Sequence, residues 1–301
     1  MNMKVDLCGV TLNNPVMTAS GTFGSGAEYA EFVDLNKLGA VVTKGVANVP
    51  WPGNPTPRVA EVYGGMLNAV GLQNPGIDLF VERDIPFLKQ FDTKIIVNVC
   101  GHSTEEYIEV VERLSDQPVD LLEINISCPN VKEGGIAFGQ DPKAVEAITK
   151  EMKKHAAQPV IMKLSPNVTD ITEMARAAEA GGADGLSLIN TITGMKIDIN
   201  RQKFVLANKT GGMSGPAIHP VAVRMVYQTA QAVSIPIVGM GGIMNAEDAI
   251  EMILAGATAV SVGTANFTNP HVTEEIVAGI RDYMERYQVA DIRDLVGAVH
   301  E

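Results

Sequence analysis

The alternation of short apolar runs with amphipathic stretches constrains the fold of this chain more than any other feature of its sequence. Short apolar runs bounded by turn residues are typical of buried strands, and apolar residues spaced three and four apart indicate helices. Eight runs predict strands, at residues 16–18, 40–43, 94–99, 119–126, 160–164, 185–189, 237–240 and 259–262. Amphipathic stretches predict helices at residues 104–114, 142–155, 171–180, 220–233, 246–254 and 273–287.

Eight strand–helix units in 301 residues predict a closed (β/α)8 TIM barrel, with a doubly wound open sheet as the alternative. Residues 5–7 and 10–12 predict an N-terminal β-hairpin ahead of the barrel. Gly39, Gly182 and Gly256 come just before predicted strands, where glycine suits a left-handed helix end. Because no linker or low-complexity tract divides the chain, we expect residues 1–301 to form one domain.

Two connections are too long for plain barrel loops. Residues 46–76 are rich in proline and glycine, and residues 191–216 form the second long connection. Both follow strands, so both belong to the carboxyl-terminal face of the predicted barrel, where barrel enzymes bind their ligands. Ordered loops of this length are usually functional, and we expect these two to cover a binding site.

Charge and composition exclude several classes of partner. The formal net charge of −12 argues against nucleic-acid binding, which requires clustered Lys and Arg. No apolar run approaches the roughly 20 residues that a membrane helix requires, and the first residues lack the apolar core of a signal peptide. We therefore expect a cytoplasmic protein with no membrane partner. The three cysteines, Cys8, Cys100 and Cys128, cannot supply four thiolates to an iron–sulfur cluster.

Polar residues recur at the carboxyl ends of the predicted strands. A single one is commonly a solvated group, but the strand ends of a barrel converge on one mouth, so the series predicts a ligand site there. Lys163 is flanked by apolar residues, and its ammonium is costly to bury without a partner such as an anion or an electron-rich ring. The series is Ser20, Lys44, Asn98, Asn125, Lys163, Asn190, Gly241-Gly242 and Gly263-Thr264.

The last two strands indicate a phosphate site. Gly241-Gly242 and Gly263-Thr264 follow them, and glycines let backbone N–H groups approach phosphate oxygens. Barrels often hold phosphate at this position. The glycine-rich residues 211–216 could add further amides, whereas the alternative is that all of these are ordinary turn glycines.

Residues 125–130 place a thiol where a predicted strand becomes a loop. Cys128 lies there beside Pro129, and a thiol of lowered pKa can act as a nucleophile or base. Free cysteine is more commonly a small buried hydrophobe, which is our expectation for Cys8 and Cys100. The five histidines show no metal-ligand spacing, so we expect no metal site and take His102, His155, His219, His271 and His300 as structural or surface groups.

Four motifs together resemble the dihydroorotate dehydrogenases of pyrimidine biosynthesis. They are NISCPNVKEGGIAFG at residues 125–139, NAVGLQNPG at 68–76, KLSPN at 163–167 and GGMSGPA at 211–217. The resemblance covers essentially the whole chain. Cysteine at position 128 resembles the class 1 soluble enzymes rather than the membrane-associated class 2. The run 132–139 is similar to the class 1B catalytic subunits, which pair with an electron-transfer subunit carrying FAD and a [2Fe–2S] cluster and reduce NAD⁺.

The resemblance also implies which residues bind. FMN would be held by Ser20, Lys44, Gly45, Asn98, Asn125, Lys163, Ile189, Gly215, Gly241, Gly242, Gly263 and Thr264. Dihydroorotate or orotate would be held by Lys44, Asn68, Ala69, Val70, Gly71, Leu72, Asn125, Asn190 and Thr191.

The same resemblance implies a mechanism and an assembly. Cys128 would remove a proton from C5 of (S)-dihydroorotate as hydride leaves C6 for FMN, giving orotate for UMP synthesis. The expected assembly is a heterotetramer of two catalytic and two electron-transfer subunits. Two alternatives stay open: a class 1A-like homodimer that reduces fumarate, and a barrel that binds a phosphate-bearing metabolite without redox chemistry.

Overall fold

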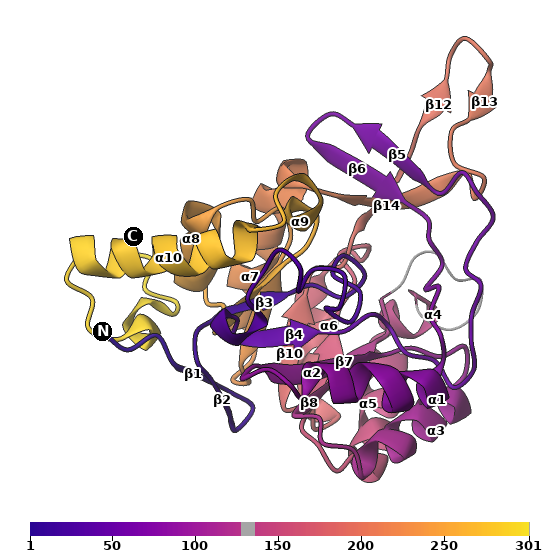
Figure 1. Ribbon diagram of the computed structural model, residues 1–301. Coiled ribbons are helices and arrows are strands. Elements are labelled where there is room, and N and C mark those ends of the chain that lie inside the picture. Colours follow the sequence, from indigo (N-terminus) through magenta and orange to yellow (C-terminus); the bar gives the residue numbers. More distant parts are fainter. Residues whose placement is uncertain (128–135, 301) are drawn as a thin grey trace.

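A closed barrel of eight parallel strands dominates the computed structural model, which describes residues 1–127 and 136–300 (Figure 1). In barrel order the strands are β3 (Val16–Thr18), β4 (Ala40–Val42), β7 (Lys94–Val99), β8 (Leu121–Asn125), β9 (Val160–Lys163), β10 (Gly185–Leu188), β15 (Ile237–Met240) and β16 (Ala259–Val262). Each lies within two residues of its predicted bounds, so the eight-strand prediction is confirmed. The open-sheet alternative is wrong, because β16 pairs with β3 and closes the barrel.

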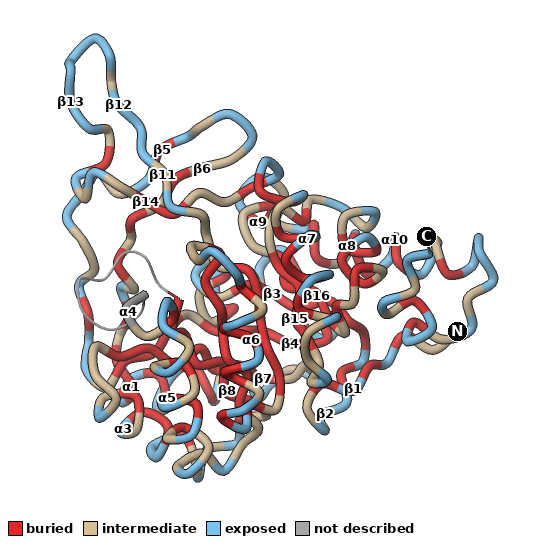
Figure 2. Tube along the Cα trace, turned by 180° about the vertical axis from the view of Figure 1, so that it is seen from behind, coloured by how far each residue is buried: buried red, intermediate tan, exposed pale blue. Residues whose placement is uncertain are grey.

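The barrel strands are buried on both faces. Every residue of β8, β9, β10, β15 and β16 is buried, which explains why their sequences are nearly continuous apolar runs. Figure 2 shows these strands as an almost unbroken buried core inside the partly exposed helices. Among the exceptions to the apolar pattern are Asn98, Glu123, Lys163 and Ser187, which are polar and buried.

The outer helices agree with the predicted helices within one residue, except that α7 ends three residues early. They are α3 (Thr104–Ser115), α5 (Pro142–His155), α6 (Ile171–Ala180), α7 (His219–Ala230), α8 (Ala246–Leu254) and α10 (Val272–Arg286). Ser103, Asp141, Asp170 and Asn245 cap four of these helices by accepting hydrogen bonds from first-turn N–H groups. No helix in the described part of the chain is long and apolar enough to span a membrane.

Shorter helical segments connect these elements. They are η1 (Leu35–Lys37), α1 (Ile77–Leu79), the π-helix η2 (Phe80–Asp84), α2 (Ile85–Leu88), α4 (Ile136–Gly139), η3 (Pro216–Ile218), α9 (Ala265–Thr268) and η4 (Ile292–Leu295). The sequence pattern did not predict them, because they are too short to show a helical period.

The predicted N-terminal hairpin is confirmed. Strands β1 (Val5–Leu7) and β2 (Val10–Leu12) pair antiparallel through a two-residue turn at Cys8 and Gly9. Both turn residues have positive φ, +56° and +83°, as a type I′ turn requires. A Cβ on Gly185, the first residue of β10, would lie 2.6 Å from Cys8 Sγ. The hairpin therefore packs against the amino-terminal end of the barrel.

The two long connections contain strands that the sequence analysis did not predict. Strands β5 (Val59–Val62) and β6 (Gly65–Asn68) come from the first, and β11 (Ile192–Met195) and β14 (Thr210–Ser214) from the second. They form one antiparallel sheet in the order β11-β14-β6-β5, which we call the mouth sheet. A small hairpin of β12 (Ile197–Asp198) and β13 (Lys203–Phe204) extends beyond it (Figure 1).

The three glycines before predicted strands do not share one role. Gly182 and Gly256 have φ of +91° and +123°, as predicted for left-handed helix ends. Gly39 is not among the positive-φ residues, so that prediction is wrong for it. A Cβ at Gly39 would lie 2.0 Å from the carbonyl oxygen of Asn14, so glycine is required there by close backbone approach.

Candidate functional site

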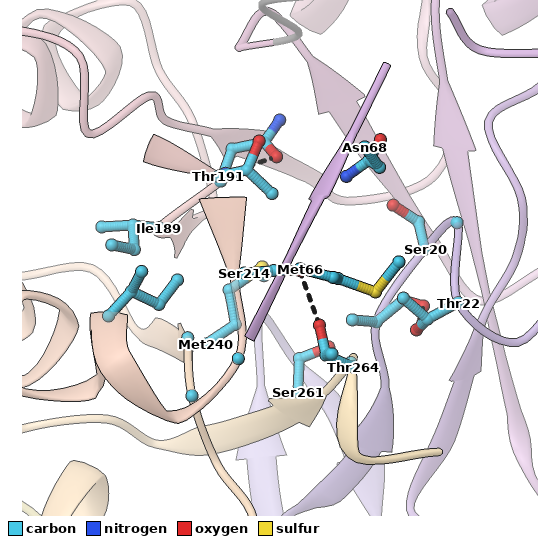
Figure 3. Close-up of a pocket in the computed structure, with 18 of the residues that line it drawn as sticks. Ser20, Thr22, Met66, Asn68, Ile189, Thr191, Ser214, Met240, Ser261 and Thr264 are labelled. Carbon is cyan, nitrogen blue, oxygen red and sulfur yellow. Dashed lines mark hydrogen bonds between the residues drawn. The ribbon is translucent and has the colours of Figure 1, made fainter. Parts of the chain in front are cut away.

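A cavity lies between the carboxyl ends of the barrel strands and the mouth sheet (Figure 3). Every barrel strand except β7 contributes lining residues from its end or from the loop that follows. Of the predicted site residues, the lining contains Ser20, Lys44, Gly45, Asn68, Val70, Gly71, Leu72, Asn125, Lys163, Ile189, Asn190, Thr191, Gly215, Gly241, Gly242, Gly263 and Thr264. Residues from nine separate stretches of sequence thus meet in one site.

Two of the described predicted site residues are not part of this lining. Asn98 is fully buried beneath the cavity, and Ala69 is fully buried in the small apolar cluster under the mouth sheet. Cys128 lies outside the described residues. The strand that leads to it is firmly held, because Tyr107 Oη donates a 2.7 Å hydrogen bond to the carbonyl oxygen of Asn125.

One side of the cavity is made of glycine backbone. Gly241 and Gly242 have φ of +128° and +69°, and Gly215 has φ of +109°. A Cβ on Gly241 would lie 2.7 Å from Ala222 Cβ, so a larger residue is excluded at this turn. With no side chains in the way, the backbone N–H groups here are accessible to an anion, which fits a phosphate.

His219, expected to be structural or a surface group, is structural and supports this glycine turn. It is buried, and its Nδ1 donates to the carbonyl oxygen of Gly241 at 2.9 Å. Its Nε2 lies 3.0 Å from Glu251 Oε2, and Asp248 is close enough for the three side chains to offer ligands to a metal ion. The sequence did not reveal this group because the three residues come from two helices.

A hydrogen bond ties the mouth sheet to the barrel at the same side of the cavity. Thr264 Oγ1, after β16, donates to Ser214 Oγ at the end of β14 over 2.7 Å (Figure 3). Ser214 was not among the predicted site residues, and neither were Thr22, Met66 and Ser261, which also line the cavity. Met66 and Ser214 reach the cavity only because the mouth sheet forms, and that sheet was not predicted.

Lys163 supplies a buried positive charge at the floor of the cavity. The residue is 4% exposed, and its Nζ donates to Ser20 Oγ at 3.2 Å. We expected a bound anion or ring as the partner of Lys163, but the protein itself supplies one, because Nζ lies 3.5 Å from Glu123 Oε2. We did not predict Glu123, because it lies inside an apolar run. It is two residues from Asn125, so both side chains lie on the same face of β8.

The opposite side of the cavity carries carboxamides and the 68–72 segment. Asn125 Nδ2 donates to Asn98 Oδ1 at 3.3 Å, and Asn190 Nδ2 donates to Ser127 Oγ at 2.8 Å. Gly71 and Leu72 have positive φ, +75° and +54°, so this segment turns sharply as it passes the cavity. Fixed amide groups around a cavity suit a planar ligand with several carbonyl or carboxylate oxygens.

The remaining two cysteines show no sign of chemistry. Cys100 is fully buried, as expected. Cys8 is partly exposed, but burial of its thiol, assisted by Asp184 and Asp6, raises its pKa to about 12. Neither thiol lines the cavity.

Fold and site together define a (β/α)8-barrel enzyme whose mouth offers glycine backbone amides, a buried ammonium and fixed carboxamides. The family model for dihydroorotate dehydrogenase matches residues 2–284. The chain belongs to the dihydroorotate dehydrogenase family, which confirms the resemblance seen in the sequence.

Two relatives of high identity are catalytic subunits of one type of dihydroorotate dehydrogenase. The chain is 72% identical over 299 residues to the catalytic subunit of dihydroorotate dehydrogenase B (NAD⁺) from Lachnoclostridium phytofermentans, covering 99% of this chain and 100% of that protein. It is 65% identical to the protein of the same name from Alkaliphilus metalliredigens, covering 99% of each. Among solved structures, dihydroorotate dehydrogenase from Eimeria tenella in complex with ferulenol has a TM-score of 0.82 at 22% identity, covering 99% of this chain and 88% of that one. At that identity the structure supports the fold alone.

Proposed function

We propose that this chain is the catalytic subunit of an NAD⁺-linked dihydroorotate dehydrogenase, which oxidises (S)-dihydroorotate to orotate in pyrimidine biosynthesis. The observation that carries the proposal is the cavity, which joins a glycine anion site, the buried ammonium of Lys163 and a set of fixed carboxamides. A barrel that only bound a phosphate metabolite would have no need for the last two. The identity to catalytic subunits of this name supports the same activity.

The residues fit FMN as the cofactor. Gly215, Gly241, Gly242, Gly263 and Thr264 would hold its phosphate through backbone N–H groups and a hydroxyl. Its ring would lie against the lining residues Ser20, Lys44, Gly45, Asn125, Lys163 and Ile189. Asn98, the remaining residue of the predicted set, would act from beneath by holding Asn125. When bound, FMN supplies the acceptor for two electrons from the substrate.

The substrate would be held by fixed donors and acceptors. Lys44 offers a cation for the carboxylate, and Asn68, Asn125 and Asn190 offer carboxamides for the ring. Thr191 and the backbone of residues 69–72 complete the proposed set.

Cys128 is the proposed base. As a thiolate it would take a proton from C5 of dihydroorotate, and a thiol with an ordinary pKa of about 8.5 ionises near enough to neutral pH to do so. Asn125, which precedes this loop, is held by Tyr107 and so fixes where the loop leaves the barrel. The mouth sheet covers the cavity and limits the access of water to it.

The electrons require a partner. Three cysteines cannot hold an iron–sulfur cluster, so the FAD and [2Fe–2S] cluster would lie on an electron-transfer subunit, in a cytoplasmic heterotetramer of two subunits of each kind. In this proposal residues 1–301 form a single FMN-binding domain with no metal of its own.

The test begins with the chain purified alone. It should be yellow or take up FMN, and it should oxidise dihydroorotate with an artificial acceptor at a rate that rises with pH as one group ionises. The Cys128→Ala variant should keep FMN and lose turnover. A colourless protein that cannot be reconstituted with FMN would contradict the proposal.

The acceptor is tested separately. Purification from native cells should recover a second subunit with iron and FAD, and only that complex should reduce NAD⁺. Reduction of fumarate by the chain alone would instead show a class 1A-like enzyme.

A further inference from the structure

Glu123 joins four neighbouring strands beneath the cavity. It lies on β8, is 3% exposed, and interacts with one side chain from each of the adjacent strands β7 and β9 and one from β10, the strand beyond β9. Asn98 Nδ2 donates to its Oε2 at 2.5 Å, and Ser187 Oγ donates to its Oε1 at 2.7 Å. Lys163 Nζ lies 3.5 Å from Oε2. Both carboxylate oxygens are therefore satisfied inside the barrel, and the carboxylate is held in one position.

This arrangement also fixes the orientation of Asn98. A carboxylate only accepts hydrogen bonds, so Asn98 must turn its NH₂ toward Glu123 and its Oδ1 away. That Oδ1 then accepts from Asn125 Nδ2 at 3.3 Å. Glu123 thus determines which face of the Asn98 amide is presented to Asn125, a residue of the cavity lining.

The charge of Glu123 matters as much as its position. Two opposite charges 3.5 Å apart, with side chains 3% and 5% exposed, are screened little by water. A group placed in the cavity next to Lys163 experiences the field of the pair, which is weaker than the field of a bare ammonium. A counter-charge at this point lowers the positive potential of the cavity floor.

We infer that Glu123 is a positioning residue that offsets the charge of Lys163 and so sets the reduction potential of the bound cofactor. The inference depends on the proposed function, because it requires FMN in this cavity. A two-electron acceptor gains negative charge on reduction, and an unscreened ammonium favours the reduced state. The carboxylate of Glu123 weakens this preference and so lowers the reduction potential.

The variant Glu123→Gln isolates the charge. Glutamine has the same shape, and its carbonyl oxygen can accept from Asn98 while its NH₂ faces the Ser187 hydroxyl. In FMN-loaded protein the reduction potential should rise. We expect at least a tenfold shift of the redox equilibrium toward the reduced cofactor, which is about 30 mV for a two-electron couple.

Ser187→Ala is the matched control. It removes one hydrogen bond from the carboxylate but keeps the charge, and Ser187 does not line the cavity. Its potential should stay close to that of the wild type. A purely structural role for Glu123 would lower the melting temperature of both variants and leave both potentials unchanged, and that result would overturn the inference.

A third variant keeps the test decisive if Glu123→Gln is recovered without cofactor. In Glu123→Asp the carboxylate is one methylene shorter and lies farther from Lys163, so the potential should rise by a smaller amount. An unchanged or lower potential would again overturn the inference. Failure of the proposed function is distinguishable, because the wild-type protein itself would then bind no FMN or leave dihydroorotate unoxidised.

Discussion

Antiparallel strands cover both ends of the barrel, but they do so in opposite ways. At the amino-terminal end, β1 and β2 are adjacent in sequence, and Leu7 and Leu12 are fully buried in the main core. At the carboxyl-terminal end, β6 pairs with β14, which lies more than a hundred residues later in the chain. The mouth sheet leaves Val59 exposed and a polar cavity beneath it.

The amino-terminal hairpin contributes to stability, whereas the mouth sheet encloses the functional site. A hairpin that buries leucines seals its end of the barrel and leaves no space for a ligand. A sheet assembled from two distant loops spans the other end without filling it, and the floor below is made of charges and amides instead of leucines. Disruption of the two ends should therefore have different consequences.

The largest effect is expected at the polar floor. Lys163→Met leaves the carboxylate of Glu123 buried without its cation, and removal of one partner of a buried ion pair costs about 3–5 kcal/mol. The free energy of unfolding, measured in urea on cofactor-free protein, should fall by this amount. The double variant Lys163→Met, Glu123→Gln should regain most of the loss, because no buried charge remains unpaired.

A surface ion pair provides the control for that experiment. Lys37 and Glu274 are 3.1 Å apart, and the Lys37 side chain is 57% exposed. Lys37→Met should cost less than about 1 kcal/mol, because solvent screens the pair. Equal losses for Lys37→Met and Lys163→Met would show that solvent screens the ion pair at the floor of the cavity as effectively as it screens the surface pair.

The amino-terminal hairpin should respond in stability alone. Leu12→Ala removes a fully buried side chain and should cost about 3 kcal/mol, within the range for leucine truncation in a core. The affinity of FMN-loaded protein for orotate, followed by the change in the flavin spectrum, should stay unchanged. A large loss of orotate affinity at constant stability would mean that the two ends of the barrel are coupled.

The two ends also differ in what could be predicted from the sequence. The hairpin and the eight barrel strands were predicted because each is a local pattern, an apolar run ending in turn residues. The mouth sheet was not, because the strands Gly65–Asn68 and Thr210–Ser214 are short, glycine-rich and stabilised by each other across a long separation. Nothing in either segment alone indicates its partner.

For the site, too, the sequence predicted one part and not another. Lys163 and the glycine pair Gly241-Gly242 were identified because strand ends of a barrel converge, which is a property of the fold and not of neighbouring residues. Glu123 and His219 act on those residues from beneath and behind the cavity. Such supporting groups have no sequence signal of their own, and they become apparent when three-dimensional contacts are available.

A single methyl group should open the mouth sheet. A Cβ on Gly65 would lie 1.9 Å from the backbone oxygen of Ser214, so Gly65→Ala forces β6 away from β14. We expect orotate affinity to fall about tenfold, equivalent to about 1.4 kcal/mol, while the free energy of unfolding changes by less. Isothermal titration of FMN-loaded protein with orotate measures the affinity.

A second glycine of the mouth sheet is the matched control. A Cβ on Gly194 would lie 3.1 Å from Leu67 Cδ2, the end of a flexible side chain that can move aside. Gly194→Ala should therefore keep orotate affinity within about threefold of the wild type, a difference below 1 kcal/mol. Equal losses in the two variants would show that contact between β6 and β14 is not what holds the cavity closed.

The smallest effect concerns the thiols at the two ends. Burial raises the pKa of Cys8 to about 12, so at pH 8 its thiolate fraction is on the order of one in ten thousand. Cys128, the proposed base at the mouth, should react much faster. Brief treatment of native protein with iodoacetamide at pH 8, followed by peptide mass spectrometry, should find label on Cys128 and almost none on Cys8.

The same raised pKa gives a pH dependence of stability with a definite sign. In the unfolded chain the Cys8 thiol has its ordinary pKa of 9.0, whereas burial in the folded protein raises its pKa to about 12. The folded state therefore holds this proton more tightly, and the contribution to stability, complete below pH 9, is lost as the pH rises toward 12. Between pH 8 and pH 10 the urea midpoint should fall less steeply in Cys8→Ala than in the wild type. Identical slopes, or labelling of native Cys8 as fast as in urea, would show that the hairpin does not seal this end of the barrel.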